Sequence, residues 1–272
     1  MNLASLGALL ATEDRARRFL VARCWANSGR RFCVRCGHGK VYRLAEKRYR
    51  CARCRYTFQD FSRRWIGRLK LSARKWLQLL KLFELEIAAP VIAREVKISY
   101  PTALKAAGLI RLAIAHESIG EGSGNAAAPG ARGKKDKSGI AGEVFAISQT
   151  AGRVQVLPLR AVSPESVLRD QIRVVKTGAV GYTDRFYDCD ALAFYVPRAL
   201  YVRFRKRFSS GQVYVDRRHR FWSYAKRRFA RQAVSARTFP LHLKELEFRY
   251  NHRHEQLFDR LVRAAVRLVP DH

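Results

Sequence analysis

Acidic residues are scarce in this sequence. Its 272 residues include 22 Asp and Glu against 54 Lys and Arg, which gives a formal net charge of +32. Hydrophobic residues still make up 48% and aromatic residues 11%, so the chain has enough apolar material for folded cores, and disorder throughout is excluded. Because the cations run through the whole chain, they predict a folded surface that grips an extended polyanion, with nucleic acid as the first hypothesis.

Long apolar runs are also missing. No stretch approaches the roughly 20 apolar residues that a membrane span needs, so no membrane partner is expected. The N-terminal LASLGALLAT lacks the basic segment of a signal peptide and runs directly into EDRARRFL, which favours an amphipathic helix. We therefore expect a protein of the cytoplasm or nucleoid.

Cysteine is too infrequent for a disulfide scaffold, with six residues, but four of them form two pairs. Cys33-x2-Cys36 and Cys51-x2-Cys54 are separated by fourteen residues, the spacing of two knuckles that close on one structural Zn²⁺. Between them, KVYRL and KRYRC alternate like strands, which indicates a zinc ribbon. The alternative is a group of redox or free thiols. Four sulfur ligands leave no open position for water, which argues against catalytic zinc.

Two segments after the cysteines have helical periodicity and predict a helix-turn-helix. LSARKWLQLLKLFEL is an amphipathic helix, and APVIAREVKISYPTALKAAGLIRLAI reads as helix, KIS turn and helix. In a DNA-binding helix-turn-helix, the early residues of the second helix face bases, here Ser99, Tyr100, Thr102 and Lys105. Nearby arginines are candidate phosphate contacts, namely Arg50, Arg53, Arg55, Arg63 and Arg64. The alternative is a helical hairpin used for packing or dimerisation.

A linker rich in small residues, GEGSGNAAAPGARGKKDKSG, precedes the last block. After it, VFAIS and RVQVLPL predict a hairpin, a helix is expected from Ser163, and AVGYTD predicts a strand that ends at Asp184. ALYVRF predicts another strand, and helices are expected over 213–231 and 239–250. The predicted divisions are 1–61 (helix and zinc ribbon), 62–118 (helix-turn-helix), 119–142 (linker) and 143–272 (mixed α/β domain), an α+β or α/β multidomain fold.

This order of elements resembles bacterial insertion-sequence transposases with an N-terminal zinc ribbon, a helix-turn-helix and a ribonuclease-H-like DDE domain. The matching stretches are RFCVRCGHGKVYRL, RYRCARCRYTF, LSARKWLQLLKLF, ISYPTALKAAGLIRLAI, GYTDRFYDCDAL, RFWSYAKRRF and FPLHLKELEFRYNHR. The resemblance implies a mixed sheet with flanking helices. It also implies strand cleavage and transfer by two divalent ions, Mg²⁺ or Mn²⁺, held by three acidic or amide side chains.

The resemblance implies three metal-ligand positions, which this sequence matches to different degrees. Asp184 takes the second metal-ligand position, His219 stands where the third acid is expected, and Lys226 matches the basic residue that follows on the same helix. The first position falls on Asn125 in a gapless alignment, or alternatively on His116 and Glu117. Neither gives a strand that ends in Asp, so the acidic triad is degenerate and impaired catalysis is expected.

The implied partners are double-stranded element ends and target DNA, bound by a homo-oligomer. The competing interpretation is a catalytically inactive, decayed or recruited transposase that acts as a DNA-binding regulator. A third interpretation, a zinc-ribbon factor of a transcription or RNA complex, leaves GYTD and FWSYAKRR unexplained. The candidate catalytic residues also have structural alternatives. Asp184 could cap the helix that follows it, and the basic residues within 217–228 could form a solvated helix face.

Overall fold

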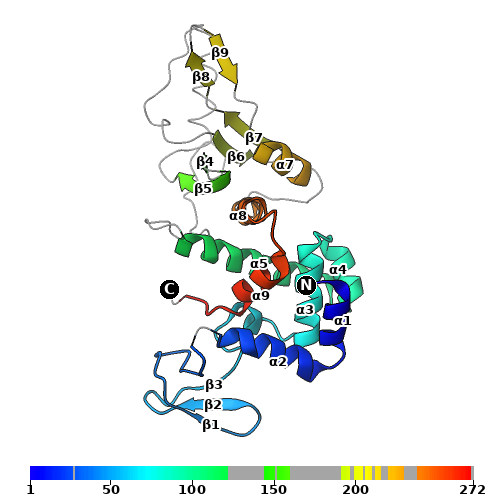
Figure 1. Ribbon diagram of the computed structural model, residues 1–272, viewed down its shortest axis with the longest axis vertical. Coiled ribbons are helices and arrows are strands. Elements are labelled where there is room, and N and C mark those ends of the chain that lie inside the picture. Colours follow the sequence, from blue (N-terminus) through cyan, green and yellow to red (C-terminus); the bar gives the residue numbers. More distant parts are fainter. Residues whose placement is uncertain are drawn as a thin grey trace. The chain divides into compact units, whose positions relative to one another are not determined.

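The computed structural model describes residues 1–26, 28–121, 144–150, 152–159, 191–196, 199–204, 206–209, 212–215, 220–229 and 238–270 (Figure 1). Contacts divide the chain into two compact units. The first consists of Met1–Glu117 together with His254–His272, and the second of Ser118–Arg253. The first unit therefore contains both ends of the chain.

The first unit begins with two helices, α1 (Leu3–Leu10) and α2 (Glu13–Cys24). Each has a side-chain cap, because Asn2 accepts from the N–H of Ser5 at 2.8 Å and Thr12 accepts from the N–H of Arg15 at 3.2 Å. The predicted N-terminal helix is confirmed as α1. Helix α2 buries a narrow stripe at four-residue spacing, Ala16, Leu20 and Cys24.

The cysteine-rich segment forms a three-stranded antiparallel sheet in the order β1-β2-β3. Its strands are β1 (Val41–Arg43), β2 (Arg48–Cys51) and β3 (Thr57–Gln59), followed by a 3₁₀ turn, η1 (Trp65–Arg68). The two strands expected between the cysteine pairs are confirmed. Burial alternates along β2 and β3, so the sheet has one packed face and one exposed face.

Helices α3 (Ala73–Glu84), α4 (Ala89–Val96) and α5 (Tyr100–Glu121) follow in the predicted places. Ser72 caps α3, accepting from the N–H of Lys75 at 3.3 Å. Glu13 of α2 reaches the same helix end and accepts from the N–H of Ala73 at 2.6 Å, so two segments of the unit meet there. A carboxylate at a helix N-terminus also favours the helix electrostatically.

The C-terminal helix α9 (Leu257–Val266) belongs to this first unit and not, as predicted, to the C-terminal domain. It contacts α2, α3 and η1 (Figure 1, α9 in red). Its apolar stripe is buried there, with Phe258 and Leu261 at most 1% exposed. Glu84 of α3 accepts from the N–H of Phe258 at 2.9 Å. Sequence order alone assigned the helix to its neighbours along the chain.

The second unit contains a four-stranded sheet in the order β5-β4-β6-β7. Its strands are β4 (Val144–Thr150), β5 (Arg153–Leu159), β6 (Ala191–Val196) and β7 (Ala199–Phe204). The predicted hairpin is confirmed as β4–β5, and ALYVRF as β7. A mixed sheet was expected, yet every strand pair among the described residues is antiparallel. The β4–β5 and β6–β7 connections span only two residues, which forces antiparallel neighbours.

The helix predicted over 213–231 is wrong in its first part. Strands β8 (Lys206–Ser209) and β9 (Gln212–Val215) pair as a hairpin, and helix α7 covers only Arg220–Phe229. The periodicity of Val213 and Val215 fits a strand equally well, and the pairing partner in β8 decides it.

Helix α8 (Phe239–Asn251) confirms the predicted late helix and packs on β5. Asn251 at its end accepts from the N–H of Val154 and donates to the carbonyl of the same residue, both at 2.7 Å. The helix and the strand are thus fixed in register. The helix expected from Ser163, the strand ending at Asp184 and linker residues 122–142 lie outside the described residues.

Candidate metal centre and nucleic-acid interface

The four paired cysteines converge at one point of the ribbon. Their sulfur atoms all lie within 4.8 Å of one another, and the separations from Cys33 to Cys54 and from Cys36 to Cys51 are both 3.6 Å. A disulfide requires about 2.05 Å, so these sulfurs are not bonded. Zinc–sulfur bonds of about 2.3 Å in a tetrahedron place sulfurs about 3.8 Å apart. The spacing of the cluster therefore fits one tetrahedral zinc ion.

Backbone turns aim the sulfurs inward. The Sγ of Cys51 accepts hydrogen bonds from the N–H groups of Arg53 and Cys54, at 3.3 and 3.4 Å. Arg55 completes the turn with a left-handed φ of 56° and donates its N–H to the carbonyl of Cys51. The first pair uses Gly37, with φ of 72°, whose N–H donates to the carbonyl of Cys33. Both turns are knuckles of the kind that the sequence spacing predicted.

The electrostatic environment differs among the thiols. Burial raises the pKa of Cys33 to about 12, whereas at Cys51 burial is outweighed by the N–H donors of Cys54 and Arg53, which lower its pKa to about 6. Cys51 therefore offers a thiolate near neutral pH, the form that binds metal. Cys24 stands apart, and burial raises its pKa to about 11, as expected of a packing residue.

The donor set fits structural Zn²⁺. Four thiolates would close a tetrahedron around the ion and leave no coordination position for water or substrate, as in structural zinc sites. Strands of three or four residues bury too little to hold the ribbon together alone. Among the described residues, the cysteine cluster is the group that brings metal ligands together.

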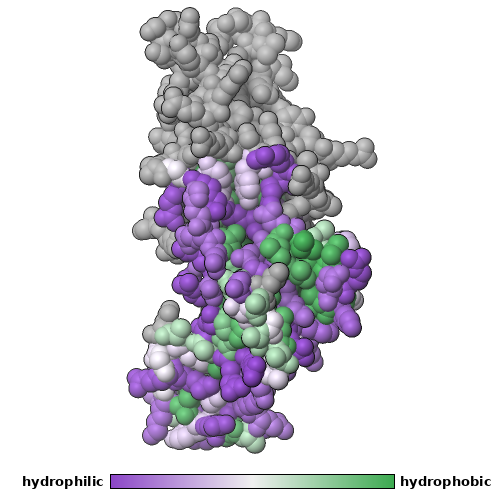
Figure 2. Space-filling model, turned by 45° about the vertical axis from the view of Figure 1, so that its right-hand side comes forward, coloured by the Kyte–Doolittle hydropathy of each residue, from purple (hydrophilic) through white to green (hydrophobic). Residues whose placement is uncertain are grey.

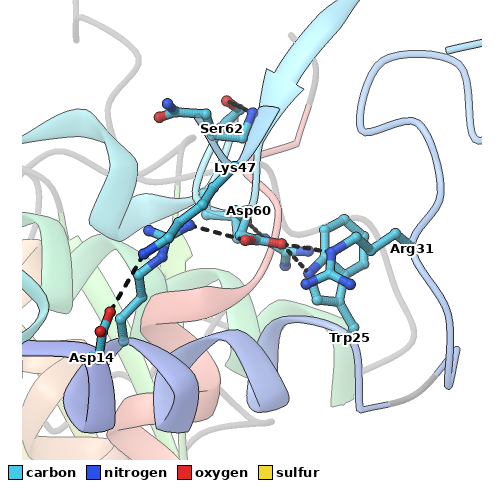
Figure 3. A network of polar contacts seen from close by, with 9 residues as sticks. Asp14, Trp25, Arg31, Lys47, Asp60 and Ser62 are labelled. Atoms are coloured by element: carbon cyan, nitrogen blue, oxygen red, sulfur yellow. Dashed lines mark hydrogen bonds and ion pairs between the residues drawn. The ribbon is translucent and has the colours of Figure 1, made fainter. Parts of the chain in front are cut away.

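A buried carboxylate attaches the ribbon to helix α2. Asp60 is 2% exposed and accepts from Trp25 Nε1 at 2.9 Å, Arg31 Nε at 2.9 Å and the Arg17 guanidinium at 3.0 Å (Figure 3). Arg64 donates from its own guanidinium to the Asp60 carbonyl at 2.8 Å. The carboxylate therefore joins the segment after β3 to α2 and to the loop that follows α2. No local sequence pattern signals this role, because the partners lie up to 43 residues away.

A short turn joins α4 to α5, where the sequence predicted a helix-turn-helix. Lys97 follows the end of α4 in the left-handed region, with φ of 53°, and the N–H of Ile98 donates to the carbonyl of Ala93 at 3.0 Å. Ala93 and Val96 are buried as predicted, and Ile98 is half-buried. The turn brings the first residues of α5 out to solvent.

The predicted base-contacting residues divide into two kinds. Ser99 caps α5, accepting from the N–H of Thr102 at 3.4 Å, and the two hydroxyls lie 2.8 Å apart. Tyr100 and Lys105 are exposed. The sequence interpretation missed Leu104, which is 45% exposed beside Lys105 and four residues after Tyr100.

The predicted phosphate-contacting arginines lie in different surroundings. Arg53 is exposed on the second knuckle and Arg63 is half-buried. Arg64 is 3% exposed, with its guanidinium donating to the carbonyls of Asp60 and Val266 and lying over the Trp25 ring. The guanidinium of Arg64 is therefore bound inside the fold and is not a phosphate contact. Figure 2 shows hydrophilic residues over much of the visible described surface.

Most of the residues assigned to catalysis by resemblance fall outside the part of the chain that the structure describes. Asp184, His219 and Asn125 lie outside the described residues. Lys226 belongs to helix α7, whose backbone is described while this side chain is not. His116, the alternative to Asn125, packs at a tilt against Trp65 with ring centroids 5.2 Å apart, and its neighbour Glu117 pairs with Arg267 at 3.3 Å. Both alternatives thus have packing roles in the first unit.

Comparison with known families gives one result, over the ribbon. Residues 11–57 match the transposase zinc-ribbon domain. No curated protein and no solved structure matches the chain. The matched segment contains α2, all four zinc cysteines and the first residue of β3, so a transposase-type zinc ribbon is present and supports a transposase-family protein. Within the described residues, no helix has the length and apolar character of a membrane span.

Proposed function

We propose that this protein binds the double-stranded ends of a mobile DNA element as a transposase-family protein. The observation that carries the proposal is the cysteine cluster inside a transposase zinc-ribbon domain. The same unit has α5 with exposed Tyr100, Leu104 and Lys105 after a tight turn. A helix presented in this way fits the major groove, where side chains distinguish base pairs.

Ribbon cations supply the non-specific part of the proposed interaction. Residues 28–60 contain ten Lys and Arg residues and two acidic residues, Glu46 and Asp60. The Asp60 carboxylate is already paired with Arg17 inside the fold. Such a surface releases counterions from DNA when it binds. We further propose a homo-oligomer on paired ends, working on DNA in the nucleoid.

Binding is tested by fluorescence anisotropy with duplexes from the ends of the encoding element and scrambled duplexes of equal length. Affinity for both should fall roughly a thousandfold between about 50 and 200 mM salt if six or more phosphates are contacted. Lys105→Ala should reduce the ratio of specific to scrambled affinity roughly tenfold. Lys70→Ala, another exposed lysine, should leave that ratio unchanged. A salt-independent affinity would contradict the proposal.

The catalytic part of the proposal rests on the resemblance. Asp184 and His219 would hold Mg²⁺ or Mn²⁺, with Asn125 at the first position and Lys226 placing the DNA. Such ions activate the attacking oxygen and stabilise the leaving oxygen. Nicking of end-bearing DNA in Mg²⁺ or Mn²⁺ tests it, because Asp184→Asn should abolish the product. Equal nicking by the variant would remove Asp184 from the mechanism.

A DNA-binding regulator without catalysis is the second candidate, favoured by one observation. The segment that should carry the first metal ligand reads GNAAAPG and has no Asp. The regulator needs only the first unit and its zinc. End-specific binding without nicking, in either metal, would support the regulator over the enzyme.

A further inference from the structure

The exposed face of the ribbon sheet has a composition that its fold does not require. Tyr42 lies opposite Arg50, and Arg50 lies opposite Thr57 across the three strands. Directly opposed residues of a sheet share a face, with Cβ atoms about 5 Å apart. The next row of the same face holds Leu44, Arg48 and Gln59. All six residues are exposed.

The opposite face accounts for packing. Tyr49 and Phe58 are buried there with ring centroids 5.8 Å apart, and Arg31 lies over the Tyr49 ring at 4.7 Å. Tyr56 stacks on Phe58 and carries Arg35 over its ring. The rings of Tyr49 and Tyr56 are therefore engaged inside the ribbon.

Tyr42 has the opposite surroundings. It is 52% exposed, and nothing in the described part of the chain stacks on its ring or bonds to its hydroxyl. Leu44, two residues along the same strand, is 37% exposed. Two large apolar side chains therefore lie next to each other on a water-exposed sheet face. Their neighbours on this face are cations and uncharged polar residues.

We propose that this face, defined by Tyr42, Leu44, Arg48, Arg50, Thr57 and Gln59 and here called the outer ribbon face, binds unpaired nucleotides of a DNA strand. The ring of Tyr42 stacks on an unpaired base, and Arg50 binds the adjacent phosphate. Thr57 and Gln59 offer hydrogen bonds to sugar or base edges. Aromatic rings set among cations are the general means of holding single-stranded nucleic acid, because every base has a π-face.

Charge and base accessibility select this occupant. Arg50 forms no ion pair with any described carboxylate, and Glu46, in the β1–β2 turn, is already 3.5 Å from Arg48. The face is therefore cationic and attracts an anionic partner. An intact duplex is anionic, but it keeps its base faces stacked internally and offers Tyr42 nothing to stack on. Unpaired strands expose those faces. The inference rests on the proposed function only in taking DNA as the partner.

The test uses the full-length, zinc-loaded protein and three probes: a blunt duplex, the same duplex with a four-nucleotide tail, and the tail strand alone. The tail carries 2-aminopurine, whose fluorescence is quenched by stacking. We expect tighter binding of the tailed probe than of the blunt one, together with quenching. Tyr42→Ala should lower the affinity for the tailed probe roughly tenfold, the effect of one lost base–aromatic stack, and so remove the preference. It should also abolish the quenching. Tyr42→Phe should keep both.

Two further variants locate the effect on the face. Arg50→Ala should weaken binding of the tail strand and lower its salt slope by about one. Arg43→Ala is the matched control, because Arg43 is exposed on the same sheet but lies opposite Tyr49 on the packed side. It should leave the preference for the tail intact. Zinc content and circular dichroism confirm that each variant is folded.

The outcomes separate this inference from the proposed function. Tyr100→Ala should weaken binding of the blunt duplex and leave the preference for the tailed probe unchanged. If blunt duplexes fail to bind while the tail strand binds through Tyr42, the proposed function falls and the outer ribbon face stands. Unchanged tail preference and quenching in Tyr42→Ala would overturn the inference, as would an equal loss in Tyr42→Phe.

Discussion

Asp60 shows how one side chain fixes the position of a whole small domain. Its carboxylate receives two guanidinium groups and an indole N–H while it is 2% exposed. A buried charge that loses its partner costs several kcal/mol, and here removing the carboxylate leaves two partly buried arginines without compensation. The attachment of the ribbon to α2 thus depends on a single residue just outside the matched zinc-ribbon segment.

We expect Asp60→Asn to lower the free energy of unfolding of the first unit by about 3–5 kcal/mol. Urea unfolding followed by tryptophan fluorescence measures it, since Trp25 lies in the contact. Asp259→Asn is the control, because Asp259 pairs with Arg23 at 2.9 Å with its side chain 41% exposed and should cost less than about 1 kcal/mol. Equal losses in the two variants would contradict the role of Asp60.

Gly67 provides a second prediction at the scale of one residue. A Cβ atom there would lie 2.0 Å from the carbonyl oxygen of Phe61, closer than any real contact, so the backbone would have to move. Gly67→Ala should destabilise the unit by about 1–3 kcal/mol. Gly108→Ala, in α5 with nothing within 4 Å of the new atom, should stabilise it by up to about 1 kcal/mol. Thermal unfolding distinguishes the opposite signs.

Among the elements, we expect the ribbon to depend on a bound metal ion. Zinc binding to four thiolates contributes on the order of 10 kcal/mol, most of it folding free energy, to strands that bury little surface. Cys51→Ser should therefore abolish stoichiometric zinc and the ribbon's protection from proteolysis. Cys24→Ser should retain one zinc per chain, because Cys24 is outside the cluster. Metal release measured with a chromogenic chelator tests both, and zinc loss in the Cys24 variant would show a different ligand set.

At the scale of elements, hydrophobic periodicity alone does not always distinguish a helix from a strand or a buried residue from an exposed one. The cysteine spacing and the strand alternation predicted the ribbon, since ligand geometry restricts the sequence directly. Residues 213–215 were predicted to be helical and form β9, because only the hydrogen-bonding partner β8 distinguishes the two conformations. The same reason explains Leu104, an apolar residue at helical spacing that the packing of α5 leaves exposed.

At the scale of the whole molecule, the last helix completes the first unit. Leu261 of α9 is 1% exposed and belongs to a helix that contacts α2 and α3. Leu261→Ala should lower the stability of the first unit by about 2–5 kcal/mol. Arg263→Ala, on the exposed side of the same helix, should change it by less than about 0.5 kcal/mol. The readout is urea unfolding, and a silent Leu261→Ala would contradict the association.

The sequence by itself determined the charge and the zinc ligands, together with the order of the N-terminal helices, because composition, ligand spacing and capping are local properties of the chain. Tertiary structure alone decided that Asp60 joins the ribbon to α2, that Arg64 is buried while Arg50 faces solvent, and that α9 joins the first unit. These are consequences of long-range packing. A side chain's surroundings are set by residues distant in sequence, and neither periodicity nor composition carries that information.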